Sequence, residues 1–138
     1  MVVIEQSAKF YPECGTCHRD CDGWVVQLVR DGRLRWEAEW VCGNCGYIVD
    51  DDGWGPAPEG IREILLNQYG FGCIQVYAYA DHGGKLLKAF RDSFGYSIQE
   101  AKGAAQDLTS AGWRGTQVEA AFISKILRGS GIEVGACA

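Results

Sequence analysis

The chain has 138 residues, of which 47% are apolar and 22% are charged, values that are ordinary for a folded protein. Residues 1–58 carry 5 basic and 10 acidic side chains and so hold the whole net charge of −5, which argues against non-specific nucleic-acid binding. No apolar run approaches the roughly 18 residues of a membrane span, and the N-terminus lacks a signal-peptide pattern, so we expect no membrane association and a cytoplasmic location.

Residues 1–49 contain five of the seven cysteines and two predicted strands. The segment 24–30 reads as a strand. In 34–41 the apolar residues alternate with charged ones, and this period of two is typical of a half-buried strand. Asp31 and Gly32 between them are a strong signal for a tight hairpin turn. The sequence therefore predicts a β-hairpin that separates two pairs of cysteines.

Each cysteine pair has the spacing of a metal knuckle. Two residues separate Cys14 from Cys17, and two separate Cys42 from Cys45, which lets a tight turn direct both sulfurs at one ion. The 24 residues between the pairs exceed the usual spacing, and the predicted hairpin accounts for the excess. Four thiolates form a closed tetrahedral set, so we expect one structural Zn²⁺ and predict that chelation unfolds this part of the chain.

Two neighbouring residues are rival ligands for this ion. His18 follows the first knuckle directly, and Cys21 is close enough to replace Cys17, although the two-plus-two symmetry favours Cys17. Asp50, Asp51 and Asp52 can be read as a hard-cation site, but three adjacent carboxylates in a loop are usually only solvated. The metal set predicted from the sequence is therefore Cys14, Cys17, Cys42 and Cys45.

The sequence predicts three segments: a zinc ribbon over 1–49, an acidic linker rich in Gly and Pro over 50–60, and a second domain over 61–138. The second domain is expected to contain a helix over 61–69, a strand over 74–80, helices over 85–94, 98–108 and about 117–128, and a strand over 132–134. Ser97 with Glu100, and Thr116 with Glu119, have the spacing of capping boxes. The predicted fold class is α+β.

Residues 73–134 resemble the C-terminal domain of the bacterial ribosomal stalk protein family. The resemblance is carried by Leu-Leu-Lys-Ala-Phe-Arg at 86–91 and Gly-Tyr-Ser-Ile-Gln-Glu-Ala-Lys at 95–102, and the closing segment 119–134 also fits. It implies a β-α-α-α-β domain, a fold shared with the adaptor of the Clp protease. Phe90, Phe94, Ser97, Gln99 and Gly103 depart from the family pattern, and a cysteine ribbon stands where the family has a dimerisation helix pair and hinge.

In that family the corresponding helix faces translational GTPases. By resemblance, a docking face is expected at Lys85, Leu87, Lys88, Arg91 and Lys102. The stretch 85–102 holds four basic and two acidic residues, and charges of this kind steer association with a partner. The expected function is a non-enzymatic zinc-binding adaptor that docks a translation GTPase, a ribosome component or another protein, with no small-molecule substrate.

Two alternatives from other classes stay open. The ribbon can bind nucleic acid through Arg30, Arg33 and Arg35, with its tryptophans as stacking platforms. The chain can also be an accessory subunit whose Trp54 region packs on a neighbour in a larger assembly. No catalytic motif is present, and we expect Cys73 to be a buried thiol and Cys137 to lie in a loose tail.

Overall fold

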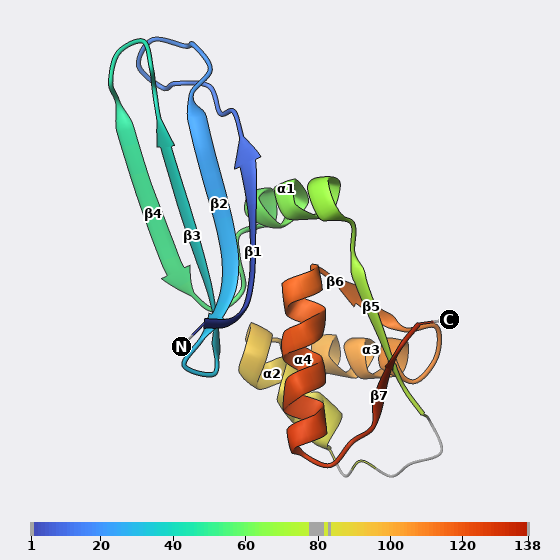
Figure 1. The fold of residues 1–138 in the computed structure, drawn as a ribbon. Coiled ribbons are helices and arrows are strands. Elements are labelled where there is room, and N and C mark those ends of the chain that lie inside the picture. The colour runs from blue at the N-terminus through green and yellow to red at the C-terminus, as the bar shows by residue number, and fades with distance from the viewer. Residues whose placement is uncertain (1, 78–81, 83, 138) are drawn as a thin grey trace. The chain divides into compact units, whose positions relative to one another are not determined.

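The computed structural model describes residues 2–77, 82 and 84–137. The chain divides into two compact units, Met1–Tyr69 and Gly70–Ala138 (Figure 1). Over the described residues it is a mixed α+β protein with four helices and two antiparallel sheets.

The first unit is built on a four-stranded antiparallel sheet with the order β1-β2-β3-β4, so that each strand lies beside the next one in the sequence. The turn between β2 and β3 is the predicted hairpin: Arg30 pairs with Arg33, and Asp31 and Gly32 have φ of 53° and 73°, as a two-residue primed turn requires. The four strands are β1 (Val2–Phe10), β2 (Asp22–Arg30), β3 (Arg33–Val41) and β4 (Ile48–Trp54).

One face of this sheet is covered by helix α1 (Glu59–Tyr69). Ala8, Val25 and Ala38 are buried from three successive strands against Ile61 and Leu65 of the helix. The alternation predicted for 34–41 is confirmed, because Leu34 and Ala38 are buried, and Trp36 and Trp40 pack on the core that contains Ala38. The helix predicted over 61–69 therefore forms, and it completes the core of the first unit rather than opening the second.

The stretch expected to be a linker differs in the structure, because Asp50–Asp52 lie within β4. This strand pairs with β3 from Val41↔Ile48 to Arg35↔Trp54. It is an edge strand of its sheet. Edge strands commonly carry charged side chains, which discourage pairing with another chain. The acidic run is therefore strand sequence, although its composition is typical of a turn.

The second unit has a three-stranded antiparallel sheet in the order β6-β5-β7 and contains the three helices α2, α3 and α4 (Figure 1). Its core contains Phe90, Leu108, Ile123 and Leu127, each fully buried. The elements of this unit are β5 (Gly72–Val76), α2 (Lys85–Phe94), α3 (Ile98–Leu108), β6 (Trp113–Gly115), α4 (Gln117–Gly129) and β7 (Val134–Ala136).

Both predicted capping boxes are present. Ser97 accepts the Glu100 N–H at 3.1 Å while the Glu100 carboxylate accepts the Ser97 N–H at 3.0 Å. Thr116 and Glu119 make the same reciprocal pair at 3.1 and 2.9 Å at the start of α4, where both residues are buried. These bonds satisfy backbone N–H groups that a helix start leaves without intrahelical partners.

The observed strands of the second unit differ from the expected ones in three places. Strand β5 begins at Gly72 and ends at Val76, and residues 78–80 of the expected strand lie outside the described residues. Strand β7 is displaced toward the C-terminus, to Val134–Ala136. Strand β6 was not predicted, because three residues between two helices show too little periodicity to be recognised.

Candidate metal centre

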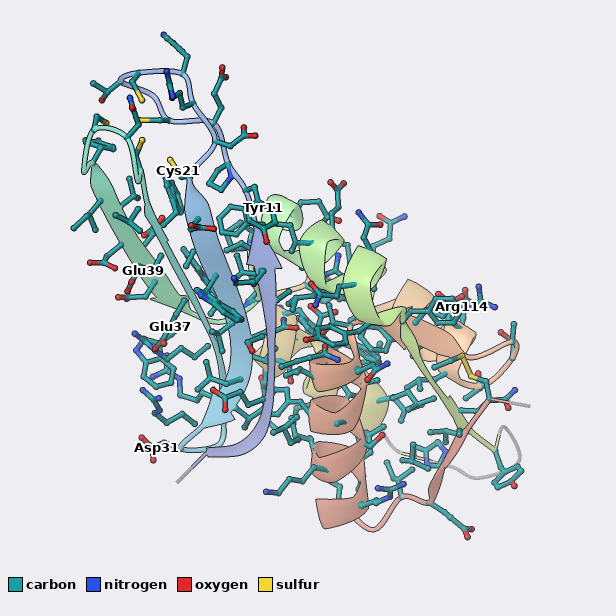
Figure 2. All side chains as sticks on the ribbon, turned by 45° about the horizontal axis from the view of Figure 1, so that its top comes forward. Tyr11, Cys21, Asp31, Glu37, Glu39 and Arg114 are labelled. Carbon is teal, nitrogen blue, oxygen red and sulfur yellow. A yellow bond between two sulfur atoms is a disulfide. The ribbon has the colours of Figure 1, made fainter. Side chains whose placement is uncertain are left out.

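Strand topology brings the two cysteine pairs to the same end of the first sheet. The first pair lies in the connection from β1 to β2, and the second lies in the connection from β3 to β4. Asp22, at the start of β2, pairs with Val41, at the end of β3. Both loops therefore leave the sheet side by side, and the sulfurs gather there (Figure 2).

The two loops have the same backbone geometry. His18 N–H donates to the Cys14 carbonyl at 2.9 Å, and Gly46 N–H donates to the Cys42 carbonyl at 2.8 Å. The residue after each second cysteine is left-handed, with φ of 62° at His18 and 76° at Gly46. The knuckles are thus local repeats of one turn. Histidine occupies a conformation that glycine adopts more readily.

The four predicted ligands form one compact group. The sulfurs of Cys14, Cys17, Cys42 and Cys45 all lie within 4.8 Å of one another. Two pairs between the knuckles are closer, Cys14 to Cys45 at 3.6 Å and Cys17 to Cys42 at 3.4 Å. Four sulfurs at about 2.3 Å from a tetrahedral ion would be about 3.8 Å apart. The spacing therefore fits a single tetrahedral metal ion.

Backbone N–H groups favour the charged form of the first sulfur in each knuckle. The N–H groups of Cys17 and Thr16 lower the pKa of Cys14 from its ordinary 9 to about 6. The N–H groups of Cys45 and Asn44 likewise lower the pKa of Cys42. Because metals bind the thiolate, these bonds prepare both sulfurs as ligands. The four cysteines can hold a metal ion, as the sequence predicts.

The two rival ligands are placed differently. His18 is exposed, its Nδ1 lies 3.8 Å from a Glu13 carboxylate oxygen, and it is not part of the sulfur group. Cys21 is 2% exposed and packs against Cys14 and Cys42. Its burial, followed by the charges of these two neighbours, raises the pKa of Cys21 to about 11. Cys21 is therefore buried beside the group of four sulfurs without being a member of it.

The expected docking residues lie on α2 and α3 of the second unit. Lys88, Arg91 and Lys102 are exposed and Leu87 is half-buried. Lys88 forms an ion pair with Asp92 at 2.9 Å, and Arg91 Nε donates to the Tyr96 carbonyl at 3.3 Å. Lys85 is also exposed, but its Nζ donates to the Ser130 carbonyl at 3.0 Å, beyond the end of α4.

Leu87 borders two hollows in the surface of this unit. A mostly apolar hollow of about 370 Å³ lies between α2 and α3 and is also lined by Leu86 and Lys102. A second, more polar hollow of about 620 Å³ is lined by Lys88 and Arg91. The structure therefore brings four of the five expected residues around two adjoining hollows.

The arginines that could contact nucleic acid are occupied by acidic and aromatic neighbours. Arg35 forms ion pairs with Glu37 at 2.9 Å and with Asp52 at 3.3 Å. Its guanidinium carbon also lies 4.9 Å from the centre of the Trp54 ring. Arg30 lies 3.9 Å from Glu37, and Arg33 stacks on Trp54 at 4.6 Å. These contacts compete with phosphate binding. Trp54, expected at an assembly interface, is 43% exposed beneath the two arginines.

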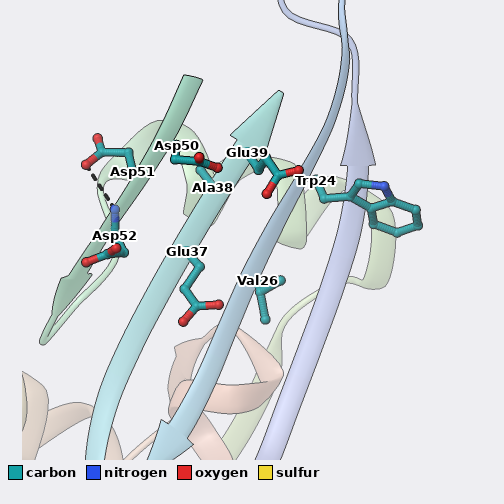
Figure 3. Close-up of a pocket in the computed structure, with 8 residues that line it drawn as sticks. All are labelled: Trp24, Val26, Glu37, Ala38, Glu39, Asp50, Asp51 and Asp52. Carbon is teal, nitrogen blue, oxygen red and sulfur yellow. Dashed lines mark hydrogen bonds between the residues drawn. The ribbon is translucent and has the colours of Figure 1, made fainter. Parts of the chain in front are cut away.

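The outer face of the first sheet is strongly acidic. Figure 3 shows Glu37 and Glu39 of β3 beside the aspartates of β4, around a hollow of about 520 Å³. Glu39 is paired in register with Asp50, and Glu37 with Asp52. Directly opposed like charges destabilise a sheet, and Arg35 offsets only the second pair. This face is unsuited to nucleic acid.

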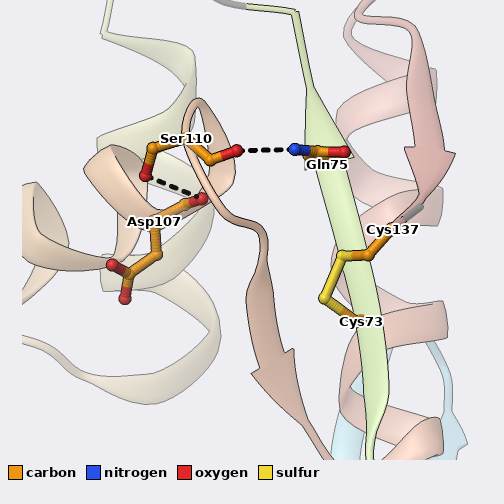
Figure 4. Close-up of a disulfide and its surroundings, with 5 residues drawn as sticks. All are labelled: Cys73, Gln75, Asp107, Ser110 and Cys137. Carbon is orange, nitrogen blue, oxygen red and sulfur yellow. Dashed lines mark hydrogen bonds between the residues drawn. A yellow bond between two sulfur atoms is a disulfide. The ribbon is translucent and has the colours of Figure 1, made fainter.

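The structure corrects the expectation for Cys73 and Cys137, which form a disulfide (Figure 4). Strand β7 pairs with β5 in the register Ile74↔Ala136, so Cys73 and Cys137 come to lie beside each other with Cα atoms 5.5 Å apart. A side chain at Gly112, where φ is 110°, would overlap both sulfurs. The bond was missed because its register depends on a strand that the sequence placed two residues too early.

The described part of the chain has no helix long and apolar enough to cross a membrane. Three features of the described residues bear on function: the four sulfurs of the candidate metal centre, the exposed basic residues of α2 and α3, and the Cys73–Cys137 disulfide. The four cysteines of the candidate metal centre and Cys21 form no disulfide. No family model, no curated protein and no solved structure matches the chain.

Proposed function

We propose that the chain is a non-enzymatic adaptor whose first unit is a zinc ribbon held by one structural Zn²⁺. The all-sulfur donor set supports zinc, which accepts four thiolates in a tetrahedral site. A closed set of four leaves no position for a reactive water, which supports a structural role for the ion. The first unit has only 69 residues, a size at which a metal commonly supplements a small core.

We further propose that the second unit, which on this account has the ribosomal-stalk type of fold, docks a protein partner. The observation that carries this proposal is the position of Leu87, half-buried between two hollows and flanked by basic side chains. An apolar anchor surrounded by charge is the usual organisation of a protein interface. The partner is expected to present an acidic surface, as a translation GTPase or another ribosome-associated protein can.

The cytoplasm remains our proposed location for such an adaptor. The observation that weighs against it is the Cys73–Cys137 bond, since disulfides are rare in reducing compartments. Counting free thiols in protein isolated under alkylating conditions decides the point. Five free thiols indicate that the bond forms where the protein resides, and seven indicate that it does not.

Charge reversal on the helix face tests the docking proposal. The full chain carrying Lys88→Glu and Arg91→Glu should lose the partners that the wild type captures from cells by crosslinking and mass spectrometry. Lys125→Glu is the matched control, because Lys125 is also an exposed lysine on a helix of the second unit but lies outside both hollows. Equal capture by the double variant, or equal loss in the control, would contradict the proposal.

A further inference from the structure

Five sulfurs, not four, meet at the knuckle end of the first sheet. Cys14, Cys21 and Cys42 form one buried cluster, with Cys17 packed against it. The backbone of Cys21 is held by its N–H bond to the Pro12 carbonyl at 2.7 Å, directly before β2 begins. Cys21 is therefore a buried thiol packed against two of the four predicted ligands, although its sulfur is not one of the four that lie within 4.8 Å of one another.

The four ligands are unequally protected from solvent. Cys14 and Cys42 are each 1% exposed, Cys17 is half-buried and Cys45 is exposed. Water, a foreign thiol or an alkylating reagent therefore reaches the site first at Cys45. Cys21 is 2% exposed and packs with the two buried ligands Cys14 and Cys42, whereas Cys45 is not part of that buried cluster. A ligand is therefore expected to be lost first at the exposed Cys45, while a fifth cysteine stays buried beside the other ligands.

We propose that Cys21 is a reserve ligand that takes the place of Cys45, an inference that rests on the proposed zinc site. In the exchange the metal–sulfur bond to Cys45 breaks and a bond to Cys21 forms. The proton of the Cys21 thiol passes to the released Cys45 sulfur, so the charge of the site and the number of thiolate ligands stay the same. The ion remains bound by Cys14, Cys17, Cys42 and Cys21 while Cys45 is free to react.

Cobalt(II) is the probe for this exchange, because its thiolate charge-transfer absorption grows with the number of Co–S bonds. The full chain should show four bonds in the wild type, in Cys21→Ser and in Cys45→Ser. The double variant C21S/C45S should show three, with the absorption reduced by about a quarter. If Cys45→Ser already shows three bonds, or if Cys21→Ser alone loses one, the reserve role is wrong.

A second measurement avoids variants at the primary ligands. Limited alkylation of the zinc-loaded wild type should modify Cys45 first, and native mass spectrometry should find the singly alkylated chain with zinc still bound. In Cys21→Ala, chosen as a small apolar replacement, the same treatment leaves three thiolates, so a larger fraction of the alkylated chain should have lost its zinc than in the wild type. Equal release from both chains refutes the inference. Failure of the wild type to bind any metal would refute the proposed zinc site itself, so the two failures are distinguishable.

Discussion

Removing the disulfide of the second unit should cost much of its stability. Cys73 and Cys137 are 64 positions apart, so the bond closes almost the whole unit into one loop. Chain entropy for such a loop corresponds to about 4 kcal/mol. A unit of 69 residues has a total stability of only about 3–10 kcal/mol. We therefore expect C73A/C137A to lose about 2–4 kcal/mol of unfolding free energy.

Trp113 allows this loss to be measured in the full chain. Four of the five tryptophans lie in the first unit, and Trp113, which is 7% exposed, is the one in the second. With 5-fluorotryptophan incorporated, ¹⁹F spectra in increasing urea report each unit separately. The Trp113 transition should move to lower urea in the double variant, while the signals of the other four tryptophans should not move.

Reduction of the wild type is the control for lost packing at the two positions. The reduced wild type and C73A/C137A should unfold at about the same urea concentration, because in both the cross-link is absent. A shift of less than about 1 kcal/mol in both would refute the chain-entropy reasoning. A shift in the double variant alone would assign the effect to the side chains instead.

Three further predictions concern single positions. His18→Gly should raise the unfolding free energy of the first unit by about 0.5 kcal/mol in urea, because the strain removed at φ 62° exceeds the entropy that glycine adds to the unfolded chain. An unchanged or lower unfolding free energy would contradict this. Asp50→Lys should stabilise it by about 0.5–1 kcal/mol by pairing with Glu39, an effect that must shrink with salt. Thr116→Ala should cost about 1–2 kcal/mol in the Trp113 transition through loss of the buried cap, and Thr116→Ser should restore most of it.

Local patterns in the sequence were sufficient for the knuckles and for much of the secondary structure. The spacing of Cys14 with Cys17 and of Cys42 with Cys45, together with the Asp31-Gly32 turn, placed four sulfurs at one end of a hairpin, and the structure brings them together. These signals are reliable because each depends on neighbours within a few residues. The capping boxes of α3 and α4 were found for the same reason.

Features that depend on long-range pairing were missed. Asp50–Asp52 read as a linker because acidic runs favour turns, yet pairing with β3 makes this stretch an edge strand. The Cys73–Cys137 bond needs the register of β5 with β7, which no local pattern specifies. The burial of Cys21 is likewise a property of the folded knuckles, because it depends on packing against Cys14 and Cys42.

The central claim is that four cysteines hold one zinc ion, and X-ray absorption at the zinc edge of the purified full chain tests it most directly. We expect one zinc per chain with a first shell of four sulfurs at about 2.3 Å. The first shell should contain no nitrogen from His18 and no oxygen from Asp50–Asp52. Absence of zinc, or a shell containing nitrogen or oxygen, would contradict the account.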